Sequence, residues 1–200
     1  GGFLSVTFIP IFFFFFASER KEEGWRVASI VFTCFGSLLL VCIVVAIIFA
    51  PRLISVLAPG LEDPLLISKA VYMTRIILPA QFFFFAGGLF MAIQFAMERF
   101  AMPALAPLIY NAGIIAGGLL LARWEGIAGF SWGVLAGAFL GNFALQFWGA
   151  RKAGMKIRID FDFRHPELRK YIILTLPLIV GLTMTFSTEL FLKFFGSFLG

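Results

Sequence analysis

The stretch VASIVFTCFGSLLLVCIVVAIIFA, residues 27–50, runs for 24 residues without one charged side chain. A helix needs about 20 consecutive apolar residues to cross a hydrocarbon core roughly 30 Å thick, so this stretch is long enough to span a membrane. The whole chain of 200 residues is 61% hydrophobic, whereas soluble domains contain about 45–50% apolar residues. The sequence therefore predicts an all-α integral membrane protein.

Further apolar stretches flank this one, and short polar breaks separate them. Together they predict six transmembrane helices, over residues 3–17, 27–50, 76–97, 103–122, 127–150 and 171–199. Residues 65–75 are predicted to form an amphipathic helical lead-in to the third span, and Asp63-Pro64 opens this lead-in. Because the chain opens inside an apolar stretch without a Met, we expect it to be a piece of a longer protein.

The basic residues between the spans predict the orientation in the membrane. Eleven Lys and Arg residues fall in loops 18–26, 98–102 and 151–170, against four on the alternating side. Loops rich in Lys and Arg stay in the cytoplasm, so these three loops are predicted to be cytoplasmic. The net charge of +5 is then a topology signal and does not indicate nucleic-acid binding.

Two opposite charges stand out in the last apolar stretch, TFSTELFLKFFGSF at residues 185–198. Glu189 and Lys193 are four residues apart, so they can pair on one helix face. Charges within a span usually face a cavity or a partner. One interpretation places both in a substrate cavity, where Lys193 is available to a phosphate and Glu189 holds it. The other makes Lys193 an anchor that reaches the outer interface.

Two more residues are candidates for substrate binding, Asn111 in the fourth span and Arg75 at the start of the third. An amide such as Asn111 inside a span either bonds a neighbouring helix or lines a wet cavity. The same choice applies to Gln81, Gln94 and Asn142. Arg75 either contacts substrate or extends to the membrane interface.

Glycines recur at every fourth residue of the fifth span, in GFSWGVLAGAFLG: they are Gly129, Gly133, Gly137 and Gly141. Small residues at this spacing let two helices in a membrane approach closely. The pattern predicts tight helix packing at these four positions. A helix that slides against its neighbours is the functional alternative.

No motif indicates a metal site, a cofactor or a catalytic residue. His165 lies near Asp160 and Asp162, but the alternation in IRIDFDF, residues 157–163, predicts a short solvated strand instead of a metal site. The chain contains no HExxH, no GxSxG and no phosphate-binding loop.

Several of these segments resemble one known family. They are GGFLSVTFIPIF (1–12), FAPRLISVLAPGL (49–61), ERFAMPALAPLIYN (98–111) and RKAGMKIRIDFDFRHPELRK (151–170). Their order and spacing are similar to those of the MurJ/MviN family of lipid II flippases, in the MOP exporter superfamily. The most specific piece is the pattern RF-x-x-PA-x-AP-x-x-x-N between the third and fourth spans.

The resemblance implies a fold of about fourteen helices in two pseudo-symmetric lobes around a hydrophilic cavity. Residues 1–200 are then part of the N-terminal lobe. The implied activity is translocation of lipid II, the lipid-linked peptidoglycan precursor, across the bacterial cytoplasmic membrane by alternating access. The implied partners are lipid II, membrane lipids and the remaining helices of the same protein, without an enzymatic step or a cofactor.

Two departures from the family are visible. Gly1-Gly2 stands where the family usually has Glu-Gly, and the functional arginines of the family fall on helices outside this chain. Two alternatives stay open: another exporter of the superfamily, for polyprenyl-linked oligosaccharides or drugs, or a membrane enzyme acting on polyprenyl lipids. The enzyme needs intramembrane His or Asp beside a nucleophile, which the spans lack.

Overall fold

A computed structural model describes residues 20–166, 168–173 and 192 of this chain. The described part is helical, with none of its residues in a strand. Its elements are α2 (Lys21–Ile48), α3 (Ala50–Leu57), α4 (Pro64–Ile77), α5 (Ala80–Ala96), α6 (Ala101–Glu125), α7 (Ala128–Gly137), the π-helix η1 (Ala138–Ala144) and α8 (Leu145–Lys152). Residues 166 and 168–173 are also helical.

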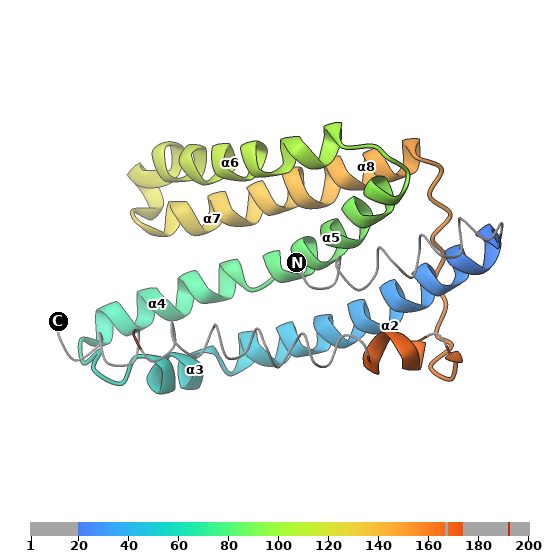
Figure 1. The fold of residues 1–200 in the computed structure, drawn as a ribbon. Helices are drawn as coiled ribbons and strands as arrows, with labels where there is room; N and C mark the ends of the chain where they lie inside the picture. The colour runs from blue at the N-terminus through green and yellow to red at the C-terminus, as the bar shows by residue number, and fades with distance from the viewer. Residues whose placement is uncertain (1–19, 167, 174–191, 193–200) are drawn as a thin grey trace.

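The helices form an elongated bundle (Figure 1). The α4–α5 run lies between α2–α3 on one side and the hairpin of α6 with α7–η1–α8 on the other. Within the described residues, four runs are long and apolar enough to cross a membrane: Lys21–Ile48, Pro64–Ala96, Ala101–Glu125 and Ala128–Lys152. They correspond to the second to fifth predicted spans, which confirms an all-α membrane fold. The predicted spans 3–17 and 171–199 lie mostly or wholly outside the described residues.

The helix boundaries differ from the prediction at charged or proline-containing ends. The second span begins at Lys21 instead of residue 27, because Glu22 and Glu23 in its first turn complement the helix dipole. The lead-in and the third span form one run that begins at Pro64 and is interrupted at Leu78 and Pro79. At its start, the Asp63 side chain accepts a hydrogen bond from the Leu65 N–H at 2.8 Å.

Two local features were not anticipated. The fifth span contains a seven-residue π-helix, Ala138–Ala144, which no sequence pattern predicts. The predicted strand over residues 157–163 is wrong, because these residues pair with no strand and instead run along α2 as an irregular segment.

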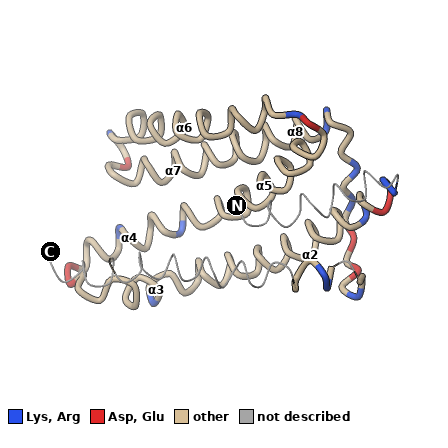
Figure 2. Tube along the Cα trace, viewed as in Figure 1, with Lys and Arg blue, Asp and Glu red and all other residues tan. Residues whose placement is uncertain are grey.

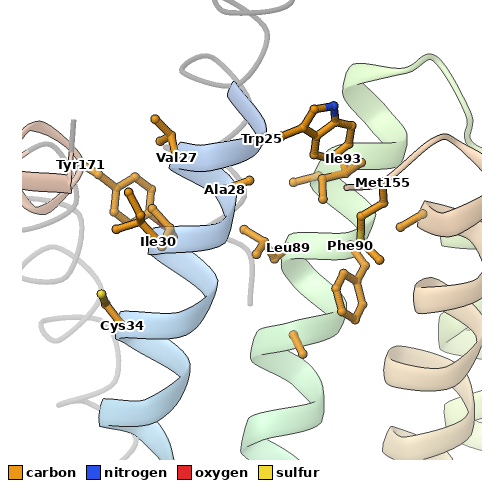
Figure 3. Close-up of a cluster of buried hydrophobic side chains, with 14 of the residues drawn as sticks. Trp25, Val27, Ala28, Ile30, Cys34, Leu89, Phe90, Ile93, Met155 and Tyr171 are labelled. Carbon is orange, nitrogen blue, oxygen red and sulfur yellow. The ribbon is translucent and has the colours of Figure 1, made fainter. Parts of the chain in front are cut away.

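The main hydrophobic cluster lies between the first half of α2 and the second half of α5 (Figure 3). Ile30 on α2 and Ile93 on α5 are each at most 1% exposed, and Phe90 is 2% exposed. Met155 and Tyr171 close the cluster from the segment that follows α8. The segment after α8 is therefore packed onto the bundle at this end.

Charged residues gather toward the ends of the bundle (Figure 2). Most of them lie where α2 begins, where α5 gives way to α6 and where α8 ends. These are the three places that the positive-inside rule assigns to the cytoplasm. The opposite end carries the loop with Glu62 and Asp63 and the turn between α6 and α7.

We expect labelling of single cysteines to follow this division. In a background without Cys34 and Cys42, a membrane-impermeant thiol reagent added outside the cell should label Glu62→Cys. The same reagent should miss Lys21→Cys and Lys156→Cys until the membrane is permeabilised. Labelling of positions 21 and 156 in intact cells, with position 62 protected, would contradict the orientation.

Candidate functional site

The glycines of the fifth span face α6 at backbone contact distance. A Cβ atom added at Gly137 would lie 2.6 Å from the carbonyl oxygen of Tyr110, and one at Gly133 would lie 2.5 Å from that of Gly113. At Gly129 and Gly141 the nearest α6 carbonyl oxygens would be 2.8 and 2.9 Å away. Real Cβ atoms do not approach so closely, so each position requires the absence of a side chain.

The partner surface on α6 contains glycines that the sequence reading missed. A Cβ atom at Gly117 would lie 2.4 Å from the Cα of Gly133, and one at Gly113 would lie 2.6 Å from the Cα of Gly137. Gly113 and Gly117 form a GxxxG pair, which is the available signal for a close helix contact in a membrane. Two glycine-lined faces therefore meet, and the two backbones touch.

A buried pair of amides joins three helices near the predicted cytoplasmic end. Gln94 on α5 donates from Nε2 to the Oε1 atom of Gln146 on α8 at 3.0 Å. Gln146 in turn donates to the carbonyl oxygen of Met102 on α6 at 2.9 Å and to that of Gly141 in the π-helix at 3.1 Å. Both side chains are at most 1% exposed. Of the two interpretations for Gln94, hydrogen bonding between helices is the one seen.

Asn111 has a different environment. It lies on the exposed face of α6, and its amide has no hydrogen-bond partner among the described residues. Leu108 and Ile115, one turn before and after it, are 65% and 58% exposed. The fold therefore leaves Asn111 available to a further helix or to a polar cavity, as the substrate-binding hypothesis requires.

Arg75 lies deeper in its helical run than the sequence suggested. It is the twelfth residue of α4, about 16 Å along the helix from Pro64, instead of standing at the start of the span. Its Nε atom donates to the carbonyl oxygen of Ile47 on α2 at 3.2 Å. The remaining nitrogens of the exposed guanidinium have no partner among the described residues. Glu189 and Lys193, the other candidates, lie outside the described residues.

The segment that follows α8 runs along α2 and is held there by hydrogen bonds from its backbone to hydroxyl side chains of α2. The backbone N–H groups of Arg158 and Asp160 donate to the hydroxyls of Ser29 and Thr33 at 3.0 and 3.2 Å. Four residues of helix rise about 6 Å, and two residues of extended chain advance about 6.6 Å, so the two spacings match. This match explains the alternation in residues 157–163, which the sequence reading took for a strand.

Ion pairs hold the same segment. Arg26 contacts the carboxylates of Asp160 and Asp162 at 3.5 and 3.1 Å, and Lys156 contacts Glu22 at 2.8 Å. Except for Asp162, these residues border a cavity of about 320 Å³ at the predicted cytoplasmic end, which Arg158 also lines. Arg26 and Lys156 already face carboxylates, so of the three cations that line this cavity only Arg158 has no ion pair among the described residues.

The described residues contain no group of three or more His, Cys, Asp or Glu side chains that could hold a metal ion. They supply close helix packing, hydrogen bonds between buried amide side chains, and a segment after α8 that is hydrogen-bonded to α2 at one end of the bundle. This fold and this site define a multi-pass helical membrane protein in which glycine-lined faces of two helices pack closely.

Comparison with known families then places the chain within that class. The family model described as "Lipid II flippase MurJ" matches residues 1–200, so the chain belongs to the MurJ family. The resemblance noted in the sequence is thereby confirmed.

Curated relatives agree with this assignment. The chain is 31% identical over 119 residues to the probable lipid II flippase MurJ of Thermotoga maritima, covering 59% of this chain and 25% of that protein. It is 27% identical to the lipid II flippase MurJ of Burkholderia cenocepacia, covering 88% of this chain and 35% of the relative. The protein of Synechocystis is 28% identical, covering 92% and 36%. The chain thus spans about a third or less of the length of these relatives.

Proposed function

We propose that the protein containing this chain translocates lipid II across the bacterial cytoplasmic membrane. The observation that carries the proposal is the match of the MurJ family model over residues 1–200, together with four described runs able to span a membrane. Lipid II combines a polyprenyl tail with a pyrophosphate-linked headgroup. Its tail can stay in the bilayer while the headgroup crosses through a polar path. No covalent bond is made or broken, so the protein acts as a transporter.

Within that protein, we propose that residues 1–200 form part of the N-terminal lobe. Close packing between α6 and α7 supports this role, because alternating access moves rigid lobes against each other. The broad exposed face of α6, which includes Leu108, Asn111 and Ile115, suits contact with the remaining helices of the protein or with membrane lipids.

The headgroup pyrophosphate needs cations in a site with little water. From this chain we propose Lys193, held by Glu189, as a phosphate contact, with Asn111 and the free nitrogens of Arg75 as further polar contacts. The paired Arg26 and Lys156 do not suit this task, since each already faces a carboxylate. Most of the cationic site is therefore expected to come from helices beyond this chain.

Complementation tests the proposal in cells. The full-length protein is expressed in a bacterium whose own lipid II flippase is depleted. We expect growth and normal cell shape to return, with lipid II no longer accumulating on the cytoplasmic side. If the protein reaches the membrane in normal amounts and the cells still lyse, the proposed activity is wrong.

A further inference from the structure

Prolines interrupt two neighbouring helical runs toward the end opposite the cytoplasmic loops. Pro51 follows the break between α2 and α3, and Pro79 lies in the break between α4 and α5. A proline has no N–H, so each leaves the carbonyl four residues earlier without its helical donor. Those carbonyls belong to Ile47 and Arg75.

Arg75 connects the two breaks. Its Nε atom donates to the carbonyl oxygen of Ile47 at 3.2 Å. This is the oxygen that lacks a helical N–H donor because residue 51 is a proline. The backbone carbonyl of Arg75 is the one that lacks a helical N–H donor because residue 79 is a proline. One residue therefore supplies the donor missing from the first break and belongs to the second.

The location makes this hydrogen bond important. Within the membrane, water is not available to serve a free carbonyl, so another donor has to be found in the protein. Arg75 is about 16 Å from the start of α4, within the run Pro64–Ala96. One turn earlier, the Tyr72 hydroxyl donates to Glu125 on α6 at 3.0 Å. Side chains of α4 thus bond to α2 on one side and to α6 on the other.

We propose that Arg75 is a positioning residue that replaces the donor lost at Pro51. The bond fixes the angle between α2 and α3 and ties that break to the α4–α5 break, so that α3 and α4 move as one unit. The role concerns the Nε atom alone. It is therefore separate from any contact that the remaining guanidinium nitrogens make with substrate.

A double-mutant cycle tests this role in the full-length protein. Pro51→Ala restores an N–H four residues after Ile47, which makes the Arg75 side chain unnecessary for this carbonyl. Spin labels at Val41→Cys and Val56→Cys, in a background without Cys34 and Cys42, report the arrangement of α2 and α3. Both label positions are more than 60% exposed.

We expect Arg75→Met to broaden the distance distribution between the labels and to lower the thermal midpoint. Adding Pro51→Ala should restore a narrow distribution and recover most of the midpoint. Arg75→Lys should give an intermediate distance distribution and midpoint, because the lysine ammonium can donate a hydrogen bond but lacks the planar geometry of the guanidinium. The matched control is Arg123→Met, which removes an exposed arginine near the same end of the bundle; it should leave the distribution unchanged.

Two results would overturn the proposal. The first is an unchanged label distribution in Arg75→Met. The second is a broadened distribution that Pro51→Ala does not recover, since Arg75 would then hold the two helices through something other than the Ile47 carbonyl. The label measurement requires no substrate, so its outcome does not depend on whether the protein transports lipid II.

Discussion

Replacing Gly137 by leucine is expected to separate α6 from α7 and to abolish folding of the bundle in the membrane. Even a Cβ atom at this position would lie 2.6 Å from the Tyr110 carbonyl oxygen, which belongs to the backbone of α6 and cannot rotate away. Overpacking of a core typically costs about 1–3 kcal/mol, and a clash with the backbone of the neighbouring helix places this change at the upper end or beyond. We expect loss of folded full-length protein, measured as its yield in the membrane and its thermal midpoint in detergent.

The matched control is Ala136→Leu, one residue earlier on α7 and exposed in the structure. It adds an equally large side chain to the same helix without entering the α6 contact. If Gly137→Leu were as stable and as active as Ala136→Leu, the glycine face would not be a packing surface.

Replacing Lys193 by methionine is expected to abolish complementation. Methionine keeps the length and the apolar body of the side chain but removes the ammonium that we propose contacts the headgroup phosphate. A hydrogen bond to a charged group contributes about 1.5–3 kcal/mol, so transport should fall about tenfold or more. Lys193→Arg should retain part of the activity, because the charge and the donors remain.

Lys69→Met serves as the control, since Lys69 is an exposed cation on α4 without a proposed role. Membrane levels of all variants are measured beside growth, which separates transport from folding. Full complementation by both Lys193→Met and Glu189→Gln would make this pair an anchor at the membrane interface and remove it from the transport site.

The membrane class and the four described spans are predictable from the sequence, because the hydropathy of a segment depends on its own residues and not on which helices pack against it. It misplaced the helix ends where local chemistry extends the helix past the apolar region. Residues 21–26 carry four charged side chains yet are helical, and the run from Pro64 continues through a proline break. Such boundaries depend on capping and on contacts with other helices.

The sequence could not show which residues far apart along the chain meet. The bonds from Gln94 to Gln146 and from Arg75 to Ile47 join positions 52 and 28 residues apart. The pairing of residues 157–163 with the hydroxyls of α2 was read as a strand, because both arrangements produce the same period of two. The glycines of α7 were visible in the sequence, but their partners on α6 became clear only from the packing.

Translocation of lipid II by purified protein is the most direct test of the proposed function. The full-length protein is reconstituted into vesicles that contain lipid II with a labelled headgroup, and a membrane-impermeant enzyme added outside cleaves every headgroup that it can reach. Vesicles with the protein should lose label from the inner leaflet as well, whereas empty vesicles and vesicles with residues 1–200 alone should lose only the outer-leaflet label. Protection of the inner-leaflet label in the presence of folded, full-length protein would contradict the assignment of this chain to a lipid II transporter.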